Sequence, residues 1–373
     1  MAQGVRRKAH GSGLLPCAAF YNSQLPTPNL RWKKGMKMKV LVTGGAGFIG
    51  SHLVEGLLRK GETVRILDDL STGKMENLQE ATGGLVPAME GQSMGPRRIT
   101  LGKQAEFIWG NITDLKTCHA ACEGVSYVFH LAALGSVQRS VEDPLASHEA
   151  NATGTLNILL AARKAEVRRF MYASSSSVFG NLSTDPEEVK PKEESDPLHP
   201  ESPYAATKLM GEFYCRIFCQ LFGLETVALR YFNVFGPRQD PNSIYSAVIA
   251  RFMNALLYGK SPVIYGDGNQ SRDFTYVENV VRANLLAMEA PGVAGGVFNI
   301  ACGQRISVND LLSRLQDISG IRMPARFEPA RTGEIRHSLS SIRQARAHLG
   351  YEPGVNFQDG LAATWEWFRK DEA

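Results

Sequence analysis

The amino-acid sequence predicts an α/β fold, a doubly wound parallel sheet joined to a smaller α/β lobe that C-terminal segments mainly form. Two observations support this prediction. Short apolar, β-rich runs alternate with helical patterns from Lys39 to Arg230, an order typical of parallel strands linked by crossover helices. After Asn233 the alternation becomes irregular, and clusters of Pro and Gly interrupt it.

The individual elements follow from hydrophobic periodicity. Runs rich in Val, Ile, Leu, Phe and Tyr predict strands, and apolar residues that recur at helical spacing predict helices. The predicted strands are Lys39–Thr43, Thr63–Leu67, Ala105–Trp109, Tyr127–His130, Arg169–Tyr172 and Thr226–Arg230. The predicted helices are Phe48–Lys60, 115–123, 149–165 and 203–222. Between Ser71 and Gln104, where Gly, Pro and Met are scattered, we expect loop and irregular helix, with residues 84–103 as a surface insertion.

The N-terminal residues differ in composition from the rest of the chain. Residues 1–38 contain seven basic side chains and no acidic one, and their only apolar patch is short and holds Pro16. We therefore expect an unstructured extension, or a start site placed too far upstream, rather than a secretory signal. The chain's charge of +4 less these seven leaves −3 for the remainder, so we expect no nucleic-acid partner.

Cysteine usage and hydropathy argue against further classes of protein. The six cysteines form no Cys-x-x-Cys pair and accompany no histidine pattern, which favours buried reduced thiols in a cytoplasmic protein and no metal site. No apolar run approaches the ~18 residues of a membrane span, so we expect no membrane association.

A glycine-rich segment, Gly44–Gly50 (GGAGFIG), follows the first predicted strand and opens the first predicted helix. In this context glycines let the backbone approach a pyrophosphate, and the helix N-terminus offers N–H groups to it. Asp68 ends the second strand 18 positions beyond Gly50, where a carboxylate accepts hydrogen bonds from ribose hydroxyls and repels a 2′-phosphate. We therefore expect a Rossmann-type NAD-binding domain over 39–232, with Asp69 as the less favoured ribose partner, unless the two aspartates only cap a turn. The expected cofactor contacts in this part are Gly44, Gly47, Phe48, Ile49, Gly50 and Asp68.

A candidate catalytic pair lies downstream of this site. Tyr204 and Lys208 are four residues apart on one face of a predicted helix, and a Ser-rich strand end, Ser174–Ser177, precedes them. With these residues the chain resembles the extended short-chain dehydrogenase/reductase family, in its NAD-dependent sugar-nucleotide epimerase/dehydratase branch. The resemblance runs from about Lys39 to Phe368 and is nearest to UDP-glucose and UDP-N-acetylglucosamine 4-epimerases. Its further motifs are HLAA at 130–133, RYFN at 230–233 and Gly266–Phe274.

The resemblance implies a catalytic set of Ser175, Tyr204 and Lys208, with Ser176 as the next serine to test. A tyrosine pKa of about 10 is too high for a base at neutral pH, but the Lys208 ammonium and the positive nicotinamide ring would favour the phenolate. Tyr204 would then take the proton of a sugar C4 hydroxyl as hydride leaves C4 for NAD. Return of hydride to the other face of the 4-keto sugar would complete a 4-epimerisation.

Two serines distinguish this reaction from related ones. The family's 4,6-dehydratases carry an Asp-Glu pair, and its UDP-glucuronate decarboxylases a Ser-Glu pair, where this chain has Ser176 and Ser177. The lack of a carboxylate at these two positions favours 4-epimerisation. Two rival functions stay open, namely a dehydrogenase that releases NADH and a scaffold or sensor that binds NAD without catalysis.

The resemblance also implies contacts with both ligands at single positions. The further NAD contacts are Asn111, Ile112, Leu131, Ala132, Ala133, Asn151, Tyr204, Lys208 and Phe232. The substrate contacts are Gly135, Ser136, Ser176, Asn233, Tyr265, Arg272, Arg331, Glu334 and Ser338. Asn111 stands where many relatives have an Asp that faces adenine. Arginine suits a diphosphate through its bidentate donors, so Arg272 and Arg331 are expected there with Asn233. Tyr265 is expected against the uracil and Glu334 at its ribose.

The expected sugar depends on small residues. A bulky aromatic at the position of Ser338 would exclude an N-acetyl group at C2, whereas Ser leaves room, and Gly135-Ser136 resembles N-acetylhexosamine epimerases. We therefore expect UDP-GlcNAc and UDP-GalNAc as substrates, with UDP-glucose and UDP-galactose, or another sugar nucleotide, as alternatives. The substrate-binding lobe should come mainly from 233–373, with some segments returning to the Rossmann domain. We also expect a homodimer, through the helices around 115–123 or through 149–165 and 203–222.

Overall fold

The computed structural model of the protein describes residues 38–84, 93–181, 189–240, 248–330 and 336–371. These residues all belong to one unit of the chain, Gly35–Ala373. The expected N-terminal extension lies outside the described residues apart from Met38, and so do residues 85–92 of the expected insertion.

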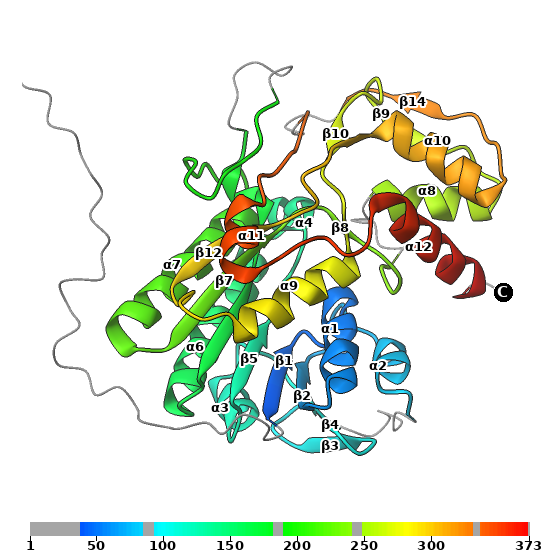
Figure 1. The fold of residues 1–373 in the computed structure, drawn as a ribbon. Coiled ribbons are helices and arrows are strands. Elements are labelled where there is room, and N and C mark those ends of the chain that lie inside the picture. The colour runs from blue at the N-terminus through cyan, green and yellow to red at the C-terminus, as the bar shows by residue number, and fades with distance from the viewer. Residues whose placement is uncertain (1–37, 85–92, 182–188, 241–247, 331–335, 372–373) are drawn as a thin grey trace, which may run out of the picture. The chain divides into compact units, whose positions relative to one another are not determined.

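An eight-stranded sheet organises the described residues (Figure 1). Its strands are β1 Lys39–Thr43, β2 Thr63–Asp68, β3 Arg98–Leu101, β4 Ala105–Trp109, β5 Tyr127–His130, β6 Arg169–Ser175, β7 Glu225–Tyr231 and β12 Gly296–Ile300. They follow the order β12-β7-β6-β5-β1-β2-β4-β3, and every neighbouring pair is parallel except β3 with β4. The strand order reverses at β1, so the carboxyl ends around it form the crevice where such sheets bind ligands. The predicted doubly wound α/β fold is confirmed.

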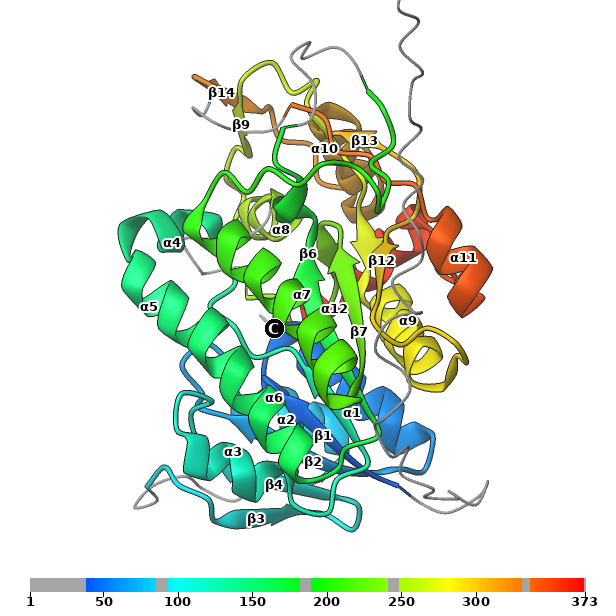
Figure 2. The ribbon, with the colours of Figure 1, turned by 90° about the vertical axis from the view of Figure 1, so that its left-hand side faces the viewer.

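Helices cover both faces of the sheet (Figures 1 and 2). On one face lie α1 Phe48–Arg59, α2 Met75–Thr82, α9 Val277–Glu289 and α11 Arg343–Leu349. On the other face lie α3 Leu115–Cys122, α4 Val137–Glu142, α5 Pro144–His148, α6 Gly154–Lys164 and α7 Pro203–Phe222. Each layer buries apolar side chains against the sheet, such as Leu53 of α1 and Ile158 of α6, and this gives two separate cores.

A smaller group of elements surrounds a third core (Figure 1). It consists of β8 Val234–Phe235, α8 Val248–Leu257, β9 Val263–Tyr265, β10 Ser271–Arg272, β11 Thr275–Tyr276, β13 Ile306–Ser307, α10 Val308–Ser319, β14 Arg326–Glu328 and α12 Phe357–Asp371. Phe252 of α8, Leu311 of α10 and Trp365 of α12 pack together there. Two later segments return to the large sheet, because β12 pairs with β7 and α9 packs on α1.

Most elements predicted for the first 232 residues are present, and β1, β4, β5 and α7 have the predicted bounds. The prediction of loop and irregular helix for 71–104 is wrong in part. A helix is present there, α2, but β3 lies within the residues expected as an insertion, where it extends the sheet edge as an antiparallel partner of β4. The helix expected over 149–165 begins as a π-helical turn, Glu149–Thr153, which hydrophobic periodicity does not distinguish from an α-helix.

Candidate active site

A cavity of about 410 Å³ opens at the carboxyl ends of the parallel strands. Residues that follow β1, β2, β4 and β5 line it, together with the ends of β6 and β7 and side chains of α7. The predicted site residues on its wall are Gly44, Gly47, Phe48, Ile49, Gly50, Asp68, Asn111, Ile112, Leu131, Ala132, Ala133, Gly135, Ser136, Tyr204 and Lys208. The structure thus brings most of the expected dinucleotide residues to one place, which we call the dinucleotide cavity.

The glycine-rich turn between β1 and α1 leaves room for a pyrophosphate. Gly44 has a φ of +70°, and a Cβ there would lie 2.7 Å from the Ala132 nitrogen. A Cβ at Gly50 would lie 2.0 Å from the Gly44 oxygen, so neither position accepts a side chain. Within the described residues no side chain caps α1 at Gly47, so the first N–H groups and the positive end of the helix remain available to an anion. These features fit the pyrophosphate of NAD.

Asp68 lies buried at the end of β2. Its Oδ2 accepts the Ala46 N–H and its Oδ1 accepts the Leu70 N–H, both at 2.9 Å. Burial raises the pKa of Asp68 to about 6, and the neighbouring charge of Asp69 adds to this effect. At neutral pH the group is therefore mostly ionised, as a carboxylate that accepts from ribose hydroxyls must be.

Asp69 and Asn111 meet at the same end of the cavity. The Asn111 Nδ2 donates to the Asp69 Oδ2 at 2.9 Å, and the Asn111 Oδ1 accepts the Thr113 N–H at 2.8 Å. At the position where many relatives have an adenine-facing Asp, the Asn111 amide oxygen thus already accepts a hydrogen bond from the protein. Asp69, the less favoured aspartate, also lines the cavity. Because 42 residues separate it from Asn111, no local pattern reveals the pair.

The predicted catalytic residues come together between β6 and α7. The side chains of Tyr204 and Ser175 share a hydrogen bond. The Lys208 Nζ lies 5.9 Å from the centre of the Tyr204 ring and donates to the Ala173 carbonyl oxygen at 2.8 Å. The Ser175 Oγ also accepts the Ser177 N–H at 3.2 Å. One strand end and one helix therefore place a hydroxyl, a phenol and an ammonium side by side.

Burial disfavours the charged forms of Tyr204 and Lys208. It raises the pKa of Tyr204, and the hydrogen bond from Ser175 offsets only part of the rise. Burial also lowers the pKa of Lys208 to about 8, so the ammonium form still predominates at neutral pH. In the protein alone Lys208 therefore does not lower the pKa of Tyr204 below its ordinary value, because desolvation penalises both charges. Further positive charge in the cavity is needed to favour the phenolate.

The sequence starts α7 just before the catalytic tyrosine. Ser202 caps the helix by accepting the Ala205 N–H at 3.1 Å, and Pro203 takes the first helical position. Tyr204 and Lys208 are then one helical turn apart, and both line the dinucleotide cavity. The helix start thus determines where the phenol meets the cavity.

Two predicted NAD contacts lie behind the cavity wall. Asn151 is 1% exposed, its Oδ1 accepts the Leu134 N–H at 2.8 Å, and its Nδ2 donates to Thr207 of α7 at 3.2 Å. Phe232 is fully buried, with its ring centre 6.2 Å from that of Phe179. Both side chains therefore support the wall of the dinucleotide cavity indirectly, Asn151 through Leu134 and Thr207 and Phe232 through Phe179.

Three substrate positions share a small region of the smaller lobe. The Asn233 Nδ2 donates to the carbonyl oxygen of Asp273 at 3.0 Å, next to Arg272. The Ser338 N–H donates to the carbonyl oxygen of Ser271 at 3.0 Å, on the other side of Arg272. Ser338 itself is buried. The predicted diphosphate residues Asn233 and Arg272 and the predicted sugar-size residue Ser338 are therefore neighbours around the segment 271–273.

The remaining substrate positions are dispersed. Gly135 and Ser136 line the dinucleotide cavity, and a Cβ at Gly135 would meet no atom within 4 Å. Ser176 begins the 3-10 turn that follows β6. Arg331 and Glu334 lie outside the described residues.

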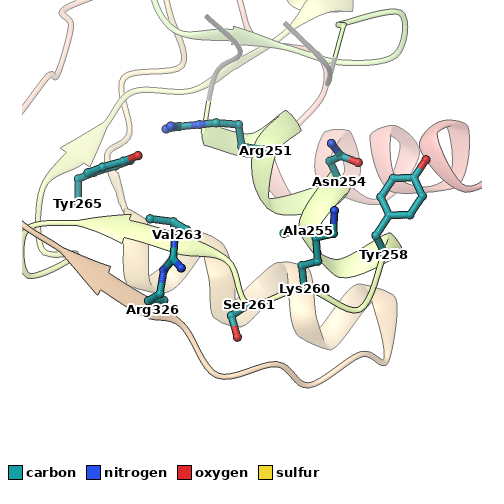
Figure 3. Close-up of a pocket in the computed structure, with 9 residues that line it drawn as sticks. All are labelled: Arg251, Asn254, Ala255, Tyr258, Lys260, Ser261, Val263, Tyr265 and Arg326. Atoms are coloured by element: carbon teal, nitrogen blue, oxygen red, sulfur yellow. The ribbon is translucent and has the colours of Figure 1, made fainter. Parts of the chain in front are cut away.

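A second cavity, of about 500 Å³, lies in the smaller lobe between α8 and the paired strands β9 and β14 (Figure 3). Tyr265 lines it, with the Arg251 guanidinium carbon 5.7 Å from the centre of its ring. Lys260 and Arg326 add two cationic side chains to the wall. Tyr265 and Arg251 also border a small recess that Arg272 reaches. The predicted uracil residue thus lies in an aromatic and cationic cavity near the predicted diphosphate residue.

Some polar residues of the dinucleotide cavity were not among the predicted contacts. They are Ser71, Thr72, Arg139, Gln239 and Asp240. Ser71 and Thr72 continue the turn after β2, a position that could have indicated them. Gln239 and Asp240 follow β8, far along the chain from the glycine-rich turn, and have no such signal.

The described residues offer neither a metal-ligand cluster nor a membrane-spanning helix. In the five described ranges, no three His, Cys, Asp or Glu side chains are grouped so as to hold a metal ion. In the same part of the chain, no helix combines the length and the apolar character needed to cross a bilayer.

Known proteins match this chain over most of its length. The model of the NAD dependent epimerase/dehydratase family matches residues 40–301. A UDP-glucose 4-epimerase of Mycolicibacterium smegmatis is 38% identical over 334 residues, which are 89% of this chain and 99% of that protein.

Two solved structures share the fold. The UDP-N-acetylglucosamine 4-epimerase of Methanobrevibacter ruminantium, in complex with UDP-N-acetylmuramic acid, is 38% identical with a TM-score of 0.80, over 90% of this chain and 99% of that one. The UDP-glucose 4-epimerase of Thermus thermophilus, in complex with NAD, is 36% identical with a TM-score of 0.76, over 89% and 99% of the two chains. The NAD cofactor and the epimerase type of enzyme expected from the sequence are confirmed. The chain belongs to the NAD dependent epimerase/dehydratase family.

Proposed function

We propose that this chain is a UDP-sugar 4-epimerase that interconverts UDP-GlcNAc and UDP-GalNAc, with UDP-glucose and UDP-galactose as the alternative pair. The observation that carries the proposal is the hydrogen bond between Tyr204 and Ser175 at the dinucleotide cavity, beside the Lys208 ammonium. Bound NAD would take a hydride from the sugar C4 and return it. Both kinds of 4-epimerase occur among the relatives described above.

In the proposed reaction the protein moves one proton. Tyr204 takes the proton of the C4 hydroxyl when hydride leaves C4, and gives it back when hydride returns to the other face of the 4-keto sugar. Ser175 hydrogen-bonds the same C4 oxygen. Lys208 keeps its own proton at neutral pH and lies close to the Tyr204 ring, so its charge, together with the positive nicotinamide ring, would favour the phenolate that accepts this proton.

The acidic side chains that line the dinucleotide cavity lie on different elements from Ser175, Tyr204 and Lys208. Asp68 and Asp69 are at the end of β2, and Asp240 follows β8, whereas Ser175 ends β6 and Tyr204 starts α7. The turn after β6 reads Ser-Ser-Val-Phe and carries no carboxylate. Dehydration uses a carboxyl acid and base at this turn in the related enzymes, so epimerisation is the reaction that these residues support.

We assign the diphosphate to Arg272 and Asn233, together with Arg331. The second cavity would then take the base, since Tyr265 offers an aromatic face and the nearby cations favour an anionic nucleotide (Figure 3). Glu334 remains the proposed ribose contact.

Small side chains support an N-acetyl sugar. Ser338 has a short side chain at the position where a bulky aromatic would occupy the space near the sugar C2. Its backbone N–H donates to Ser271, the residue before Arg272. The surroundings of Gly135 are open, and the Ser136 Oγ is turned to its own helix, where it accepts the Arg139 N–H at 3.1 Å. Such short side chains would leave room for an acetamido group.

The proposal is tested by incubating the purified protein, without added NAD, with UDP-GlcNAc, UDP-glucose or UDP-glucuronate and resolving the 4-epimers by chromatography. We expect UDP-GalNAc from UDP-GlcNAc. The matched variant Ser338→Tyr should lose UDP-GalNAc formation and keep any UDP-galactose formation. Formation of UDP-galactose alone by the parent would reject the N-acetyl assignment, and no epimer from any of these sugars, even with NAD supplied, would reject the 4-epimerase.

We further propose that the protein is a homodimer that pairs through α6 and α7. Phe213, Ile217 and Leu221 of α7 are 45%, 40% and 52% exposed, and their spacing places them in one stripe. Leu160 of α6 is also exposed, and both helices lie on the same face of the sheet (Figure 2). Two helices from each of two copies can bury such stripes as a four-helix arrangement with two-fold symmetry.

Charged substitutions in this stripe should separate the copies. We expect the double variant Ile217→Lys, Leu221→Lys to sediment as a monomer in analytical ultracentrifugation while the parent sediments as a dimer. Phe327→Lys, which changes a 58% exposed side chain on β14, is the matched control and should remain a dimer. A parent protein that is monomeric at micromolar concentration would disprove the proposed dimer.

A further inference from the structure

A short segment after β8, Gly236–Asp240, crosses from the smaller lobe to the first helices of the sheet domain. We call it the strap. Gln239 and Asp240 of the strap line the dinucleotide cavity. The Lys74 Nζ lies 3.8 Å from an Asp240 carboxylate oxygen, which links the end of the strap to the segment between β2 and α2. The strap is thus one wall of the cavity and comes from a different part of the chain than the glycine-rich turn.

Arg238 anchors the strap. Its Nη2 donates to the Glu55 Oε2 of α1 at 2.9 Å and its Nε donates to the Glu80 Oε2 of α2 at 2.8 Å, with the side chain only 7% exposed. His52 of α1 adds a third link, because its Nε2 donates to the Pro237 carbonyl oxygen at 3.0 Å. Burial lowers the pKa of His52 to about 4, so this ring is neutral near pH 7 and the link persists.

The backbone conformation of Arg238 and one polar atom of Gln239 indicate that the strap has a role in ligand binding. Arg238 has a φ of +63°, a left-handed conformation that residues with a Cβ adopt only when their surroundings impose it. The Gln239 Oε1 is buried and, within the described residues, has no hydrogen-bond partner. The other amide atom, Gln239 Nε2, donates to the Val234 carbonyl oxygen at 3.3 Å, and because that carbonyl can only accept, the amide orientation follows. A buried acceptor without a partner on the wall of a ligand cavity is suited to a ligand donor.

We propose that the strap retains NAD, with Arg238 as the positioning residue that holds Gln239 against a ribose hydroxyl of the dinucleotide. The hydroxyls are the abundant donors of NAD, whose pyrophosphate offers only acceptors. An enzyme that returns the hydride to its product does not need to exchange NAD, so slow cofactor release costs it nothing. The inference depends on the NAD cofactor and is independent of which sugar the enzyme accepts.

The test measures the rate at which purified protein loses NAD. Protein carrying NAD is diluted into NAD-free buffer, and the bound fraction is followed over time by rapid gel filtration and absorbance. For Arg238→Met, which keeps the apolar stem, we expect release about tenfold faster or more, because losing an anchoring charged contact acts chiefly on dissociation. Binding of UDP, measured by calorimetry, should change by less than about twofold, since the carboxylate partners of Arg238 lie on α1 and α2 and not among the residues assigned to the diphosphate.

Two further variants complete the test. Arg59→Met is the matched control, because Arg59 pairs with the same Glu55 from an exposed position, and it should release NAD at the parent rate. Glu80→Gln removes one of the two anchors at a carboxylate that is 42% exposed, and should give an intermediate rate. The proposal is overturned if folded Arg238→Met releases NAD at the parent rate. Should that variant not fold, an unchanged rate in Glu80→Gln would overturn it.

Discussion

Replacing Tyr204 with Phe should lower the epimerisation rate by at least ~10³-fold while NAD stays bound, because general acid–base catalysis by one side chain contributes about 10²–10⁴-fold. Burial raises the pKa of Tyr204 in the protein alone, so the phenolate that takes the sugar proton depends on the positive charges beside it. Phenylalanine keeps the ring and removes only the oxygen that exchanges this proton. The measurement is kcat with whichever UDP-sugar the parent epimerises, together with the NAD content of the purified variant.

A tyrosine on the same helix provides the control. Tyr214 of α7 is half-buried, packs against the apolar core on that face of the sheet, and does not line the dinucleotide cavity. Tyr214→Phe should therefore keep kcat within about twofold, as substitutions away from the reacting atoms usually do. A Tyr204→Phe enzyme with more than a tenth of the parent rate would mean that another group transfers the proton.

Local patterns were enough to predict the turn and the helices that line the dinucleotide cavity. The strand before Gly44, the glycines themselves and the helix that starts at Phe48 are contiguous, and each has a direct physical signal. The same holds for α7, where Ser202 and Pro203 mark the start and Tyr204 and Lys208 follow one turn apart. Such predictions succeed because the residues that determine the structure lie next to one another in the chain.

Contacts between distant segments were not predictable in this way. Arg238 reaches Glu55 across 183 residues, and nothing in either local sequence indicates the pairing. The edge strand β3 was also missed, since its short RITL run is largely exposed and only its antiparallel pairing with β4 makes it a strand. The pKa of Tyr204 was expected to fall, because the adjacent ammonium is visible in the sequence whereas the burial that opposes it is not.

The last large effect concerns a buried ion pair directly behind the catalytic set. Glu212 lies one turn beyond Lys208 on α7, and its two carboxylate oxygens accept from the Nε and Nη2 of Arg230 on β7, each at 2.8 Å. The side chains are 5% and 3% exposed. Ser174, the neighbour of Ser175, donates to the same carboxylate. The pair therefore joins α7 to both strands that carry the catalytic wall.

Removing one partner of this pair should destabilise the protein strongly. For Glu212→Gln we expect the free energy of unfolding in urea to fall by about 3–5 kcal/mol, because the Arg230 charge is left buried without its counter-ion. The double variant Glu212→Met, Arg230→Met should recover much of the loss, since an apolar pair of similar size leaves no charge uncompensated. Glu352→Gln is the control, because the Arg346–Glu352 pair is also bidentate but more than half exposed, and it should leave the free energy of unfolding almost unchanged. If Glu212→Gln and Glu352→Gln lowered the free energy of unfolding equally, burial would not be the reason why the Glu212–Arg230 pair stabilises the protein.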